Sequence, residues 1–252
     1  MTSSSTERPD EAIAPEGGRL LTPPGARAAL GFWSGVMTAV CAVGFLVGNL
    51  AFPTPAWQGM TAYITQFDSL QMLWIIPALL LAPSFLILMV CIRDSAAKSK
   101  RLFADAGVAF TTVYVALASV NYLVQILVVW PGLLRGEAQG LTFLSMANPR
   151  SLFFALEGPS YLFQEIGIIF AALVFVAPGI QRLIRWSLFG AGFGCWPIAA
   201  LLVLVLPKAV LSALGPMGVV SVGTDLWAIF LAVSGGLLAA YFRRAAPIPG
   251  PT

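Results

Sequence analysis

Long apolar segments separated by short polar ones dominate the chain between residues 29 and 244. Six of them reach the roughly 20 residues that a helix needs to cross the hydrocarbon core of a bilayer. They are 29–51, 70–92, 108–130, 151–177, 186–206 and 219–242. The pattern predicts an all-α polytopic membrane protein with one domain at 29–244, a bundle of six transmembrane helices. Four prolines inside these segments, Pro77, Pro83, Pro159 and Pro197, predict kinks that neighbouring helices can accommodate.

The residues on either side of this domain have a different composition. Residues 1–28 are rich in Ser, Pro, Glu and Gly, and residues 245–252 contain three prolines. Such segments cannot bury enough apolar surface to offset the entropy of ordering. We therefore expect two disordered tails around the helical domain.

The amino-acid composition supports the membrane assignment and excludes several kinds of metal site and catalytic site. The chain is 58% hydrophobic and only 10% charged, with a mean hydropathy of +0.87, whereas soluble domains carry about 25% charged residues. It contains no histidine, which excludes histidine-ligated haem or zinc and Ser-His or Cys-His catalysis. The three cysteines all lie in apolar segments and are typical of small core residues. We expect no cofactor, no metal, no nucleic-acid partner and no catalytic activity.

The placement of Lys and Arg predicts the orientation. Eleven of these residues fall in the N-terminal tail, after the second segment, after the fourth, and at the C-terminal end. The remaining three are Arg135, Arg150 and Lys208. Loops enriched in Lys and Arg stay in the cytoplasm. This distribution predicts a cytoplasmic (inner) membrane protein with both termini in the cytoplasm.

Polar residues inside the apolar segments gather in the half of the bundle that this orientation places outside. Glu165 is the exception, because it lies deep in the segment 151–177. None of the six segments carries a Lys or Arg near its middle that could pair with it. A charged side chain at bilayer depth costs about 2.5 to 3.5 kcal/mol on insertion scales and commonly marks a functional site. The candidate ligand-binding residues are Glu165, Glu157, Tyr161, Asn121, Gln125 and Asp225. If these side chains face each other, they form an outward-facing polar cavity with Glu165 at its floor.

Glu165 has three possible roles. It can be protonated and donate a hydrogen bond to an amide such as Gln125, because desolvation disfavours the charged carboxylate. It can titrate during function, as a proton-relay or coupling acid. It can also pair with a cation from outside the chain, such as a substrate amine, a metal ion or a basic residue of a partner helix. The sequence leaves all three open.

The other candidates have simpler interpretations too. Asp225 fits the first turn of a helix that begins near Thr224, where an acid is favourable. Glu157 is interfacial if Pro159 opens the membrane span. Asn121 and Gln125, four residues apart and thus on one helix face, can serve as interhelical hydrogen-bond partners worth about 0.6 kcal/mol on average.

Two stretches carry a resemblance to known proteins. Asn121-Tyr-Leu-Val-Gln125 is followed by Asn148-Pro-Arg-Ser-Leu-Phe-Phe-Ala-Leu-Glu157 and then by Tyr161. Together they resemble the NYxxQ and NPxSLFxALE-type segments of a group of prokaryotic multi-pass membrane proteins with about six helices and no assigned activity. The resemblance implies a multi-pass membrane protein and directs attention to Glu157 beside Asn121 and Gln125.

Two functions fit these observations. The first is binding or transport of a proton-coupled or cationic small molecule in the outward-facing cavity. The second is a non-catalytic membrane subunit or sensor whose buried acid pairs with a partner chain. The lipid bilayer is the one partner that both functions share.

Overall fold

The computed structural model describes residues 24–245, except for the side chains of 211–217, and all the secondary structure in this part of the chain is helical. The predicted tails at 1–28 and 245–252 lie almost entirely outside the described residues. Only their inner ends are described: the first helix begins at Pro24, earlier than the expected start at 29, and Ala245 caps the last helix.

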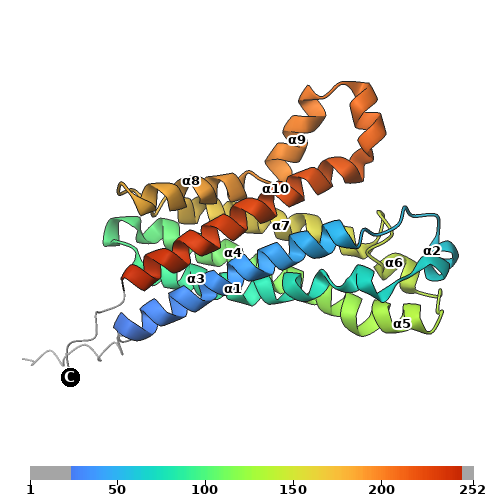
Figure 1. The fold of residues 1–252 in the computed structure, drawn as a ribbon, viewed down its shortest axis with the longest axis horizontal. Helices are drawn as coiled ribbons and strands as arrows, with labels where there is room; N and C mark the ends of the chain where they lie inside the picture. Colours follow the sequence, from blue (N-terminus) through green and yellow to red (C-terminus); the bar gives the residue numbers. More distant parts are fainter. Residues whose placement is uncertain (1–23, 246–252) are drawn as a thin grey trace, which may run out of the picture.

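Six helices pack side by side into a closed bundle (Figure 1), in which each contacts the next along the chain and the last contacts the first. They are α1 (Pro24–Ala51), α3 (Ile75–Ser95), α4 (Arg101–Val124), α7 (Leu152–Ala172), α8 (Ile180–Gly192) and α10 (Lys208–Arg244). Each one overlaps one of the six apolar segments of the sequence, so the helical bundle is confirmed.

The short elements lie mainly at one end of the bundle (Figure 1). They include α2 (Met60–Gln66), η1 (Ser69–Met72), a π-helical turn η3 (Gln125–Val129) that continues α4, α5 (Trp130–Leu134) and α6 (Leu141–Leu144). The opposite end holds η2 (Lys98–Lys100) and the 173–179 loop between α7 and α8.

Four helical stretches of the described chain are long and apolar enough to cross a membrane. They are Gly25–Ala51, Ser69–Ser95, Lys98–Leu134 and Gly218–Arg244, and α8 with α9 (Trp196–Val205) makes a fifth if the bent pair counts as one span. The 21-residue helix α7 is not among them, because Glu157, Pro159, Gln164 and Glu165 lower its hydropathy. The membrane assignment therefore rests on four or five spans, while α7 as a sixth and the orientation remain predictions.

The expected continuous helix at 186–206 is instead broken. Helices α8 and α9 meet at Phe193–Cys195 with a bend of 62°. Pro197, in the first turn of α9, can occupy that position because the first amides of a helix have no intrahelical acceptor. Beyond the bend, α9 and the beginning of α10 form a hairpin that leaves the bundle (Figure 1).

Aromatic side chains from several helices fill the centre of the bundle at the level of the polar residues. Phe45 of α1 meets the rings of Trp74 and Trp227 edge to face, at centroid distances of 5.5 and 5.7 Å. Trp74 in turn contacts Tyr122 and Phe153. Such pairs add about 0.5 to 1.5 kcal/mol beyond area burial. The polar candidates therefore border an aromatic core.

Candidate functional site

Glu157 of α7 lies against α4 and is held by two neutral donors. The Asn121 amide donates to one carboxylate oxygen at 2.8 Å, and the Tyr122 hydroxyl donates to the other at 2.9 Å. Asn121 also donates to the Phe153 carbonyl at 3.2 Å. Asn121 and Tyr122 are buried, whereas Glu157 is only partly buried. Two of the candidate residues, Asn121 and Glu157, are thus in direct contact across the α4–α7 interface.

Glu165 lies two turns further along α7 and faces the α8–α9 break. Its Oε1 accepts hydrogen bonds from the backbone N–H groups of Cys195 and Trp196, at 2.7 and 3.1 Å. Its Oε2 is buried and has no hydrogen-bond partner among the described residues. A carboxylate at a helix N-terminus satisfies free N–H groups and interacts favourably with the helix dipole. Glu165 therefore caps α9 from a neighbouring helix.

Two glycines fix the position of this break against α10. A Cβ on Gly194 would lie 2.7 Å from the Cα of Trp227, and a Cβ on Gly223 would lie 2.6 Å from the Cys195 carbonyl oxygen. Both distances are too short for a real side chain. The backbone of the break and that of α10 thus approach each other as only glycine allows, which presents the α9 N–H groups to Glu165.

The other predicted residues have different partners. Gln125 donates to the Leu144 carbonyl at 2.8 Å and accepts from the Met146 N–H at 3.1 Å. It therefore holds the segment after α6, and the hydrogen bond from Glu165 to Gln125, an example given for one of the three possible roles of Glu165, is not formed. Tyr161 packs edge to face on Trp227 at 4.8 Å.

Asp225 accepts a hydrogen bond from Asn49 of α1 at 3.4 Å. It lies within the long helix α10, which begins at Lys208, and not in the first turn of a helix starting near Thr224. Gly218 and Gly223, which suggested a later start of the helix, both lie inside α10. The structure thus joins Glu157 to Asn121, places Tyr161 near Tyr122 of the same group, and gives Glu165, Gln125 and Asp225 separate contacts.

Two further residues belong to this polar region and were not predicted as site residues. Tyr122 donates a hydrogen bond to Glu157. Its position next to Asn121 in the sequence was the one feature that could have identified it as a site residue. Gln164 is fully buried, and neither end of its amide has a hydrogen-bond partner within the described chain. It lies near the buried Tyr114 of α4. The α4–α7 interface therefore carries polar side chains beside Glu157 and Gln164, and it is apolar where Phe110 stacks on Phe163 and Phe170.

The arrangement can hold protons or cations. Eight residues separate Glu157 from Glu165, which corresponds to about 12 Å along a helix. The hydrogen bonds that each carboxyl accepts come from neutral donors, and the three ion pairs of the described chain involve other residues. In residues 24–245, no three Cys, Asp or Glu side chains come together as metal ligands.

Comparisons with protein-family models, with curated protein sequences and with solved structures found no match to this chain.

Proposed function

We propose that this is a non-catalytic six-span protein of the cytoplasmic membrane, with both termini inside, that binds a proton or a cationic small molecule at the carboxyls of α7. The resemblance to the prokaryotic multi-pass group with NYxxQ segments is part of this proposal. One observation carries it: Glu157 and Glu165 lie on one helix inside the bundle, and only neutral groups hydrogen-bond to them.

The two carboxyls have different roles in this proposal. Glu157 is the first group that a proton or cation meets in this proposal, because Glu157 is less buried than Glu165 and lies beside the aromatic residue Tyr122. Aromatic faces and a carboxylate together favour organic cations. Glu165 couples the binding of a proton or cation to the conformation of the α8–α9 break, because it accepts hydrogen bonds from the start of α9. A change in its charge alters the strength of that cap, since hydrogen bonds to ionised acceptors are stronger than neutral ones.

Infrared difference spectroscopy of the purified full-length protein across a pH step tests proton binding. We expect the carbonyl stretch of protonated carboxyls to appear as the pH falls, and Glu157→Gln and Glu165→Gln each to remove part of that signal. Glu137→Gln is the matched control, because Glu137 is exposed and paired with Arg135 at 2.6 Å. That hydrogen bond lowers the pKa of Glu137. Spectra of both α7 variants identical to the wild type would refute proton binding.

Binding of tetraphenylphosphonium to the detergent-solubilised protein tests the cation arm. The proposal expects saturable binding that Glu157→Gln weakens at least tenfold and Glu137→Gln leaves unchanged. Equal binding by both variants would exclude Glu157 as a cation site.

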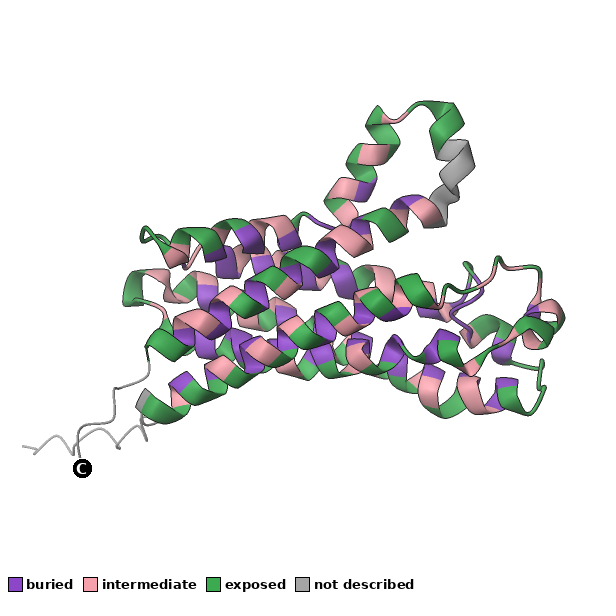
Figure 2. Cartoon of the chain, in the orientation of Figure 1, coloured by how far each residue is buried: buried purple, intermediate pink, exposed green. Residues whose placement is uncertain are grey.

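A second function is favoured by the apolar hairpin that α9 forms with the beginning of α10. Leu204 and Val205 are 82% and 69% exposed, and in Figure 2 most of α9 is coloured as exposed or intermediate. In this alternative the protein is a membrane subunit or sensor, a partner helix covers α9, and a basic residue of that partner pairs with the free Oε2 of Glu165. Co-purification of a membrane protein that Glu165→Gln or Leu204→Asn abolishes would support it, and unchanged recovery from all variants would reject it.

A further inference from the structure

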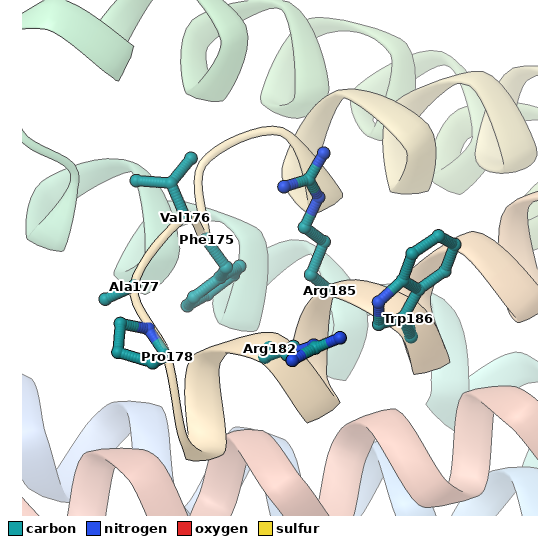
Figure 3. Close-up of a pocket in the computed structure, with 7 residues that line it drawn as sticks. All are labelled: Phe175, Val176, Ala177, Pro178, Arg182, Arg185 and Trp186. Atoms are coloured by element: carbon teal, nitrogen blue, oxygen red, sulfur yellow. The ribbon is translucent and has the colours of Figure 1, made fainter.

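A cavity lined by arginines lies at the end of the bundle that holds the loop between α7 and α8, away from the short helices α2, α5 and α6. It has a volume of about 390 Å³ and lies between the start of α8 and the loop that follows α7. Its lining residues are Phe175, Val176, Ala177, Pro178, Arg182, Arg185 and Trp186. Figure 3 shows the α8 side chains and the loop side chains around it. Two of the seven lining residues are arginines and none is acidic.

The two arginines belong to the same face of α8, because residues three apart on a helix are neighbours. Neither Arg182 nor Arg185 forms an ion pair with any described residue. No Asp or Glu occurs in the sequence between Glu165 and Asp225. Within residues 24–245, the two positive charges at the cavity therefore have no acid paired with them.

Arg185 is oriented by its surroundings. Its guanidinium carbon lies 5.7 Å from the centre of the Phe189 ring. Its Nε is buried and has no hydrogen-bond acceptor within the described chain. Because a guanidinium has only donors, a buried and unpaired Nε–H lacks an acceptor that a ligand can supply.

A second cavity near the same end provides a contrast. It has a volume of about 170 Å³ and is lined by Arg27 and Asp94, whose side chains form an ion pair at 3.3 Å. There the cation is already neutralised within the protein. Of these two cavities, the one at Arg182 and Arg185 combines an unfilled space with arginines that form no ion pair with a described residue.

We propose that the Arg182–Arg185 cavity binds a phosphate group. Guanidinium groups match phosphate oxygens with paired hydrogen bonds, and the two charges balance a phosphate without a further cation. The ligand is a phospholipid headgroup or a free phosphate compound, which share this chemistry. The exposed ring of Trp186 and the apolar walls formed by Phe175 and Val176 suit a lipid, since Trp and basic residues at the cytoplasmic surface engage anionic lipids.

Thermal unfolding of the delipidated full-length protein in dodecylmaltoside tests the site. Three ligands are added separately: phosphatidylglycerol, phosphatidylcholine and inorganic phosphate. The test variant is R182Q/R185Q. The control is R243Q/R244Q, which removes the same charge from the end of α10 at the same end of the bundle.

Phosphatidylglycerol at saturation should raise the melting temperature of the wild type and the control by about 5 °C. It should leave R182Q/R185Q within about 1 °C of its lipid-free value. A rise with phosphatidylglycerol alone identifies the lipid headgroup as the source, and an equal rise with inorganic phosphate identifies soluble phosphate. Phosphatidylcholine distinguishes a general phosphodiester site from one selective for anionic lipid.

The proposal is overturned if none of the three ligands raises the melting temperature of the wild type. It is also overturned if R182Q/R185Q responds as strongly as the wild type, or if R243Q/R244Q loses the response equally. Should R182Q/R185Q fail to fold, R185Q alone is read against R244Q by the same criteria. The site does not depend on Glu157 or Glu165, so its failure leaves the proposed function untouched.

Discussion

Glu165 shows how a carboxyl can be accommodated in the interior of a membrane protein without a cation. A break in a transmembrane helix frees backbone N–H groups that the bilayer cannot satisfy. Glu165 accepts hydrogen bonds from two of them, those of Cys195 and Trp196, and is itself 2% exposed. The carboxyl of Glu165 and the free N–H groups of the break thus supply each other's hydrogen-bond partners. Loss of either leaves buried polar groups without a partner.

This contact predicts different effects for two substitutions at one position. Glu165→Gln retains a carbonyl oxygen that can accept both N–H bonds, so we expect a loss below about 1 kcal/mol. Glu165→Ala removes the acceptor and should cost about 1 to 3 kcal/mol, the usual penalty for an unsatisfied buried donor. Unfolding of the purified variants in mixed micelles measures the difference. Equal stabilities of the two variants would show that the cap does not contribute.

The sequence located a deeply buried acid but did not predict its hydrogen-bond partners. The depth of Glu165 follows from its place in an apolar segment, whereas the contact between Asn121 and Glu157 was suggested only by the resemblance that drew attention to these residues. Side-chain partners were considered for Glu165, whereas the observed partners are main-chain amides. The sequence does not show which backbone N–H groups lack a partner, because every residue except proline carries the same group. Pro197, in the first turn of α9, was the nearest indication in the sequence that free amides lie next to it.

At the scale of the elements, α1 and α10 approach each other closely through small residues. A Cβ on Gly235 would lie 2.8 Å from the backbone nitrogen of Ala39 and from the carbonyl oxygen of Gly35. A Cβ on Gly35 would lie 2.9 Å from the carbonyl oxygen of Gly235. Small residues at such crossings allow two helix backbones to pack directly in a membrane. The first and last helices of the bundle are therefore joined through paired glycines.

Two adjacent glycines provide a matched test of this crossing. Gly235→Ala forces α1 and α10 apart, and we expect a loss of about 1 to 3 kcal/mol from overpacking. Gly236→Ala is the control, because a Cβ there meets nothing within 4 Å and alanine favours the helix. Unfolding of both variants in the same micelles gives the comparison. Equal losses would mean that α1 and α10 are not in contact at Gly235.

Hydropathy located the helices but could not show the break between α8 and α9. An average over about 20 residues records how apolar a segment is and contains no information on its direction. The Gly-rich stretch 190–194 followed by Pro197 indicates a helix end. The 62° bend depends on how closely Gly194 and Gly223 allow the chain to approach α10, which is a property of the packed bundle.

At the scale of the whole molecule, α7 is the helix that decides the topology. Its polar side chains face neighbouring helices: Glu157 contacts α4, and Glu165 contacts the start of α9. Intramembrane acids that face a bundle interior are less costly than those that face lipid. We therefore expect α7 to cross the membrane because its neighbours satisfy it, although it lacks the hydropathy of an independent span.

Cysteine labelling in intact cells tests this crossing. The native cysteines Cys41, Cys91 and Cys195 are buried, so the wild type provides a low background. Three exposed positions receive single cysteines: Ser99→Cys before α4, Ala138→Cys before α7, and Ala177→Cys after α7. We expect a membrane-impermeant maleimide to label position 138 in intact cells. Positions 99 and 177 should become labelled only after the membrane is permeabilised.

The three positions separate the possible topologies because each pair isolates one helix. Labelling of 138 but not 99 in intact cells means that α4 with its extension to Leu134 crosses the membrane, as its length and hydropathy require. Labelling of 138 and 177 together would mean that α7 does not cross. In that case Glu165 would lie near the outer surface, and the basic end formed by Arg182 and Arg185 would face away from the cytoplasm. Labelling of 177 only after permeabilisation instead gives α7 a full crossing and places its two carboxyls at different depths of one bundle.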